Sequence, residues 1–103
     1  MAEREAVVTN EYGIHARPSA LVWKEASKYR LKAYITKPNN PDIQFLCEDI
    51  MELMTMAAPL GTKLIVHVEG DDEEARNMCD NLAKLISADH EMQIAEYNDM
   101  MGR

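Results

Sequence analysis

One of the three histidines in the chain has neighbours that could support chemistry. Residues 10–20 read NEYGIHARPSA, in which His15 is followed by Ala16, Arg17 and Pro18. Proline is well tolerated in the first turn of a helix, where an N–H group has no intrahelical acceptor to lose. The spacing therefore predicts a helix that begins directly after His15, with the amides of Ala16 and Arg17 directed outward beside the histidine.

This setting suits transient phosphorylation of the imidazole. A neutral imidazole is a nucleophile near pH 7, because its reference pKa of about 6.5 leaves most rings unprotonated. The helix N-terminus and the Arg17 guanidinium would stabilise the charge of a phosphoryl group, and Lys24 and Lys28 would extend the positive potential along the same side. A histidine that only caps the helix or packs in the loop fits the same position. The helix end alone leaves both interpretations open.

The distribution of charge limits the classes of partner. The net charge is -7; up to Asn40 there are 7 Lys and Arg against 4 Asp and Glu, whereas from Pro41 onward there are 4 against 14. A chain that is acidic overall does not suit general nucleic-acid binding, because a polyanion needs an excess of cations. The basic excess surrounds His15 instead.

Other features of the sequence predict a small cytoplasmic protein. There is no apolar run of 18 residues and no signal peptide, so we expect no membrane insertion. Cys47 and Cys79 have no CxxC partner, which favours two inert core thiols over a disulfide or a metal site. We expect no cofactor and a monomeric protein.

Alternating and helical periodicities predict the elements that must position His15. Strands are expected at residues 5–9, 31–37, 43–47 and 62–69, and helices at 16–29, 49–58 and 71–86. The residues expected to face inward are Ala6, Val8, Ser19, Val22, Trp23, Ala26, Leu31, Ala33, Ile35, Leu64, Val66, Val68, Ala75, Met78, Cys79, Leu82, Leu85 and Ile86. Asp49 with Glu52, and Asp71 with Glu74, are predicted to cap the second and third helices.

This order of elements, βαββαβα, occupies about 87 residues. Each strand has one apolar face, which predicts an α+β open-faced sandwich: a four-stranded antiparallel sheet with three helices on one face. We therefore expect one domain at residues 1–87. Residues 88–103 would form a C-terminal extension, either a mobile tail or an extra element that packs on the domain.

The segments GIHARPSA, DIMELM and EGDDEE, in this order of elements, resemble the HPr family. These are the histidine-containing phosphocarriers of the bacterial sugar phosphotransferase system and its nitrogen-system relative. The resemblance covers about residues 3–87. It implies that His15 accepts a phosphoryl group on Nδ1 from enzyme I, with phosphoenolpyruvate as the source, and that Arg17 contacts the phosphate. The group would then pass to an enzyme IIA component, so the protein would be a carrier and not an enzyme.

The resemblance also implies a docking surface and one departure from the family. Ile50, Met51 and Met54, with Ala20 beside them, occupy the positions of apolar docking residues, although core packing would also explain them; Leu53 and Ala57 are expected to be more buried. Asp49 stands where many HPr proteins carry a serine that a regulatory kinase phosphorylates. It is either a helix cap or a permanent negative charge that alters partner choice.

Three functions are consistent with the sequence. The first is a phosphocarrier. The second is an HPr-like regulatory adaptor that docks on partner proteins without passing phosphate to a transporter, which the acidic second helix favours. The third is an unrelated α+β module that binds RNA through its open sheet, but the exposed face would offer few aromatic or basic platforms for bases.

Overall fold

The computed structural model of the chain describes residues 1–10, 16–88 and 90–101. In this part of the chain the strands are β1 (Ala2–Val7), β2 (Ala33–Lys37), β3 (Asn40–Leu46) and β4 (Lys63–Val68), and the helices are α1 (Ala16–Ala26), α2 (Ile50–Met54), α3 (Glu73–Ile86) and α4 (His90–Met101). The predicted order of elements is confirmed as far as α3. The helix α4 follows it.

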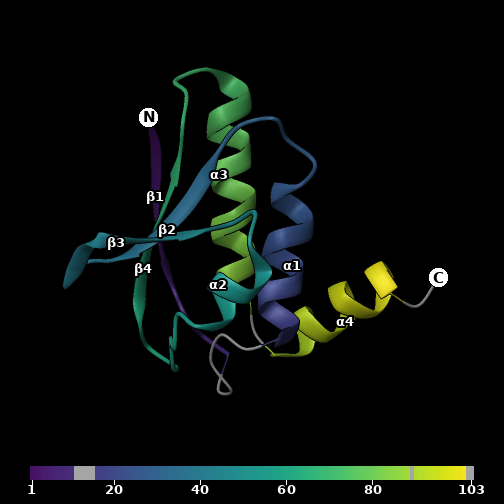
Figure 1. Cartoon of the computed structure of the whole chain (residues 1–103). Helices are drawn as coiled ribbons and strands as arrows, with labels where there is room; N and C mark the ends of the chain where they lie inside the picture. Colours follow the sequence, from purple (N-terminus) through teal and green to yellow (C-terminus); the bar gives the residue numbers. More distant parts are fainter. Residues whose placement is uncertain (11–15, 89, 102–103) are drawn as a thin grey trace.

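The four strands form one antiparallel sheet in the order β1-β4-β2-β3. In this sheet Ala6 lies opposite Leu64, and Ile35 lies opposite Val66, so the apolar residues of neighbouring strands share one face. Figure 1 shows α1 and α3 side by side on that face. The predicted α+β open-faced sandwich is therefore correct, with α4 as an additional helix.

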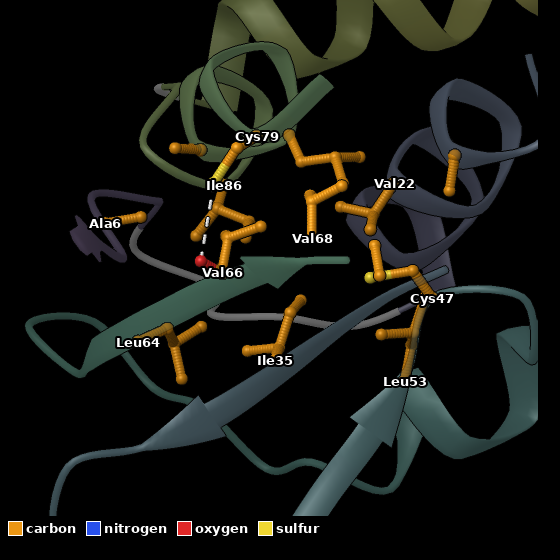
Figure 2. Packing of buried hydrophobic residues seen from close by; sticks show 14 of the residues in the cluster. Ala6, Val22, Ile35, Cys47, Leu53, Leu64, Val66, Val68, Cys79 and Ile86 are labelled. Atoms are coloured by element: carbon orange, nitrogen blue, oxygen red, sulfur yellow. Dashed lines mark hydrogen bonds between the residues drawn. The ribbon is translucent and has the colours of Figure 1, made fainter. Parts of the chain in front are cut away.

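The core lies between the sheet and the helices. Ile35, Leu64 and Val66 are fully buried, as are Met78 and Leu82 from α3. Each such side chain contributes about 1.5–3 kcal/mol through removal from water. Figure 2 shows how the strand and helix residues interdigitate, with the Cys79 thiol donating a hydrogen bond to the carbonyl oxygen of Val66 at 3.4 Å.

Two strands are longer than predicted because pairing with a neighbour extends them. Strand β1 begins at Ala2, which lies opposite Val68 of β4. Strand β3 begins at Asn40, which lies opposite Lys37 across a two-residue turn. Pro41 is compatible with a strand here because β3 is at the edge of the sheet, where a missing N–H costs little.

Helix α1 differs from the prediction in length and in its buried face. It ends at Ala26 instead of Tyr29, and Trp23 is 39% exposed although it was expected to face inward. Leu21 is buried in its place. Helix α4 packs against α1, and Leu21 lies beside Glu96 and Asp99 of α4, which accounts for its burial.

Helix α2 is shorter than predicted, since it ends at Met54 with Thr55 as its C-cap. The prediction that Ala57 is buried is wrong: Ala57 is exposed and has a φ of 51°, so the chain turns at this residue. This turn directs Met56 and Ala58 into the core, where each is 2% exposed. The prediction that Leu53 is buried is confirmed.

The acidic run before α3 is structural, but a different residue caps the helix. The N-cap is Asp72, whose carboxylate accepts a hydrogen bond from the Ala75 N–H at 2.9 Å, and not the predicted pair of Asp71 and Glu74. Asp71 forms an ion pair with the N-terminal ammonium of Met1, which lowers the pKa of that carboxyl below its usual value. The ion pair between Met1 and Asp71 was not predicted, because it depends on β1 beginning at Ala2 and the predicted strand began at residue 5.

Residues 90–101 form α4, so the extra element is present and helical. Gln93 is fully buried, and Figure 1 shows α4 beginning near the N-terminal end of α1 and running away from the sheet. Within the described residues, none of the helices has the length and apolar character needed to cross a membrane.

Candidate functional site

His15, the predicted phosphoryl acceptor, lies within residues 11–15, outside the described residues; the described residues that flank this segment are Asn10 and Ala16. Helix α1 begins at Ala16, as predicted. Its first turn contains Arg17 and Pro18, the latter buried. The N–H groups of a first turn have no intrahelical acceptors and carry the positive end of the helix dipole. The helix start that an anion beside His15 requires is therefore present.

Arg17 contacts Tyr97 of α4, a contact that the sequence analysis did not predict. The side chain is half-buried, and its Cζ lies 5.6 Å from the centroid of the Tyr97 ring on α4. A guanidinium over an aromatic ring gains about 0.5–2 kcal/mol, depending on how far it is removed from water. Nothing in the sequence pointed to Tyr97, because residues 88–103 had no assigned structure and lie far from Arg17 along the chain.

A second contact joins α4 to the residue that precedes 11–15. Asn10 is 1% exposed, and its side-chain amide donates a hydrogen bond to the side-chain oxygen of Gln93. The amide nitrogen of Gln93 in turn donates to the carbonyl oxygen of Leu85 at 3.1 Å. Buried amides of this kind are held in place by their hydrogen bonds, since breaking them leaves polar groups without partners. Helix α4 is thus attached on both sides of the segment that contains His15.

The basic residues farther along α1 meet acidic residues from α4. Lys24 and Lys28 are exposed, and Lys28 lies beyond the end of α1. Lys28 donates a hydrogen bond to Glu25 at 2.9 Å; this contact and, to a smaller extent, Glu96 raise the pKa of Lys28. Glu96 and Asp99 line the same surface hollow as the two lysines. The positive potential predicted along this side is therefore partly compensated.

Helix α2 lies beside α1 (Figure 1), and it carries exposed apolar side chains. Met51 is 68% exposed and Met54 is 43% exposed, while Ile50 and Ala20 are half-buried. Core packing therefore does not account for the two methionines. Exposed methionines on a short helix suit an adaptable contact surface.

Asp49 is the N-cap of α2. Its Oδ1 accepts hydrogen bonds from the N–H groups of Met51 and Glu52, at 3.0 and 3.1 Å. The predicted capping box is not closed, because the Glu52 carboxylate accepts from the Leu46 N–H at 3.2 Å instead of that of Asp49. Capping thus explains why an aspartate is favoured at this position.

His67 lies on the other face of the sheet, away from α1. Its two ring nitrogens lie 2.8 Å from a carboxylate oxygen of Glu3 and 2.8 Å from the Thr36 hydroxyl, and the ring stacks on Tyr34 at 4.6 Å. The described residues contain no group of three His, Cys, Asp or Glu side chains that could hold a metal ion. This histidine has a packing role.

Comparison with known proteins then decides the family. The family model described as the PTS HPr component phosphorylation site, where PTS denotes the phosphotransferase system, matches residues 2–88. The chain belongs to the HPr family. The phosphocarrier protein HPr of Treponema pallidum is 37% identical over 75 residues, which cover 73% of this chain and 82% of that protein. The HPr proteins that the chain matches are named phosphocarriers, so the general role is to carry phosphoryl groups in the phosphotransferase system and not to act as an enzyme.

Two further relatives bear on the fold and on the range of functions. The crystal structure of HPr-C-His from Thermoanaerobacter tengcongensis superimposes with a TM-score of 0.71 at 30% identity, covering 92% of this chain and 97% of that one. The HPr-like protein Crh of Halalkalibacterium halodurans is 31% identical over 74 residues, which cover 72% of this chain and 84% of that protein. The hypothesis of an unrelated RNA-binding module is therefore wrong. Since the family match ends at residue 88, α4 lies outside it.

Proposed function

We propose that His15 is the phosphoryl acceptor of this HPr-family protein. In the proposed step, the lone pair of Nδ1 attacks phosphorus while the bond from phosphorus to enzyme I breaks; phosphoenolpyruvate is the original source. The observation that carries the proposal is the start of α1 at Ala16, which puts Arg17 and the first-turn amides directly after His15. Both would stabilise the phosphate dianion on the imidazole.

The first test is phosphorylation in solution. Incubation with enzyme I, magnesium and phosphoenolpyruvate should give a chain whose phosphate is labile in acid and stable in base. His15→Ala should abolish this product. The matched control is His67→Gln, which removes another imidazole but keeps a polar side chain beside Thr36; it should be phosphorylated as well as the wild type. Phosphate on the His15→Ala variant would contradict the assignment.

We propose in addition that partners dock on the surface formed by α2 and the adjoining side of α1. The residues proposed for docking are Ala20 and Lys24 of α1, Lys28 just beyond its end, and Ile50, Met51 and Met54 of α2. Lys24 and Lys28 also line the hollow that they share with Glu96 and Asp99 of α4. The exposure of Met51 and Met54 supports this role, since a partner would gain by covering them. Enzyme I and an enzyme IIA component, of a sugar or a nitrogen phosphotransferase system, would use the surface in turn, and the carrier would act as a monomer.

A regulatory adaptor is the second candidate function. The permanent carboxylate of Asp49 on α2 and the similarity to an HPr-like protein Crh favour it. The two functions differ in the fate of the phosphate. A phosphorylated chain that returns its phosphate to enzyme I but passes none to any enzyme IIA component would support the adaptor, whereas transfer to an enzyme IIA component would support the carrier.

A further inference from the structure

We propose that Tyr97 on α4 is a positioning residue for Arg17, and that α4 is by this contact part of the phosphoryl-acceptor site. The inference rests on the proposed function of His15 and deepens it. It concerns a helix that lies beyond residue 88, where the family match ends.

The first step is that α4 has a defined position on the domain. Gln93 is fully buried and bonded at both ends of its amide, to the Asn10 side chain and to the Leu85 carbonyl oxygen. A helix cannot rotate about its axis without breaking such bonds, which would leave buried polar groups without partners. Tyr97 follows Gln93 by four residues and so lies on the same side of the helix, one turn later. The anchor at Gln93 therefore directs Tyr97 toward α1.

The second step is the effect on Arg17. An arginine side chain has several rotatable bonds, and holding it at a phosphate costs conformational entropy. The Tyr97 ring, 5.6 Å from the guanidinium carbon, restricts that freedom before the phosphoryl group arrives. The face of the ring attracts the delocalised charge of the guanidinium and does not bind a particular N–H group. A carboxylate in its place would compete with the phosphate for the same N–H donors. The Tyr97 ring can therefore help to position Arg17 without itself neutralising the guanidinium.

The two attachments of α4 act on opposite ends of the same segment. Asn10 precedes residues 11–15, and Arg17 follows them in the first turn of α1. Both flanking residues therefore contact the same helix, α4. An Arg17 side chain that is already held in place needs less ordering in the transition state, and this contributes to the rate of transfer.

The experiment measures phosphorylation of the full-length chain by enzyme I, with the variants Tyr97→Ala, Tyr97→Phe and Asn98→Ala. Tyr97→Ala should lower kcat by about two- to fivefold, the value of one partly exposed cation–π contact, with KM for the carrier nearly unchanged. Tyr97→Phe keeps the aromatic ring and should be phosphorylated with the kcat of the wild type. Asn98→Ala shortens the neighbouring exposed side chain of α4 and is the matched control, expected to behave as the wild type.

A double-mutant cycle with Arg17→Ala separates positioning from a general structural role. If Tyr97 acts through Arg17, then Tyr97→Ala should cause no further loss in the Arg17→Ala background. Additive losses, a Tyr97→Phe variant as slow as Tyr97→Ala, or a Tyr97→Ala variant as fast as the wild type would each overturn the proposal. If the wild-type chain accepts no phosphate, the proposed function itself is overturned. This result is distinct from the others, because it is seen in the wild type alone, whereas the Tyr97 proposal is tested by comparing variants that accept phosphate.

Discussion

The carboxylate of Asp49 accepts two N–H hydrogen bonds at the start of α2, so its negative charge lies at the positive end of that helix. At the scale of single residues, Asp71, Asp72 and Asp49 are chemically alike but have different roles. Asp72 caps α3, and Asp71 pairs with the N-terminal ammonium. Which role a residue has depends on the backbone groups within reach of its carboxylate.

Two substitutions at Asp49 separate its cap from its charge. Asp49→Ala removes both and should lower the free energy of unfolding by about 1 kcal/mol, whereas Asp49→Asn keeps a good N-cap and should cost little. Urea unfolding followed by circular dichroism measures both values. Glu48→Gln removes an adjacent exposed charge that is not the N-cap, and should change stability by less than about 0.5 kcal/mol. Equal losses in Asp49→Ala and Asp49→Asn would show that the cap bonds contribute nothing.

The same pair of variants tests the regulatory interpretation. If the charge of Asp49 weakens docking on α2, Asp49→Asn should lower KM for the carrier in the enzyme I reaction, because only the charge is lost. An unchanged KM in Asp49→Asn would leave Asp49 with a capping role alone.

At the scale of elements, the hydrophobic core of the domain is complete without α4, whereas α4 is held in place by its contacts with the domain. The core between the sheet and the other helices is formed by residues before position 87. Helix α4 adds the buried amide of Gln93, which contacts Asn10, and the ring of Tyr97, which contacts Arg17.

A chain that ends at Ala88 tests the domain boundary. We expect it to fold, because the cluster of buried residues is complete without α4. Its free energy of unfolding should be lower by about 1–3 kcal/mol, since Asn10 and the Leu85 carbonyl oxygen lose their hydrogen bonds to Gln93. Hydrogen exchange should show slow amides in β2, β4 and α3 in both chains. Loss of this protection in the shorter chain would mean that residues 1–87 are not an independent domain.

At the scale of the whole molecule, the two thiols report on global unfolding. Cys47 and Cys79 are each 1% exposed, and burial raises the pKa of Cys47 to about 12 and that of Cys79 to about 11, from an ordinary value of 9.0. The folded state therefore favours the neutral thiols. The stability that this contributes is fully present below pH 9 and is lost as the pH rises through 9 toward 11 and 12, where the unfolded chain gains thiolates first.

Alkylation with iodoacetamide at pH 8 should consequently be slow for both cysteines and should follow the unfolding equilibrium. The thiolate is the reactive form, and the folded chain neither exposes nor ionises these groups. Mass spectrometry after timed labelling, with increasing urea, measures the rate. An added exposed cysteine, Asn98→Cys, is the control and should react at once. Rapid native labelling of Cys47 would contradict its placement in the core.

Features that depend on near neighbours along the chain were predictable from the amino-acid sequence. Alternation in β4 predicted that Leu64, Val66 and Val68 face inward; Pro18 predicted the start of α1; and Asp49 predicted the cap of α2. These results follow from strand periodicity and from the orphan groups of helix ends, both of which are local.

The contacts of α4 with Asn10 and Arg17 became known only from the folded arrangement of the chain. This helix carries no clear apolar stripe, and the side chain that anchors it is the polar Gln93. The sequence of α4 therefore has no hydrophobic periodicity from which its packing could be predicted. The burial of Leu21 in place of Trp23, the pair of Asp71 with Met1, and the contact of Arg17 with Tyr97 all join segments distant along the chain. Such contacts form because chain folding brings their surfaces together, and no local pattern records them.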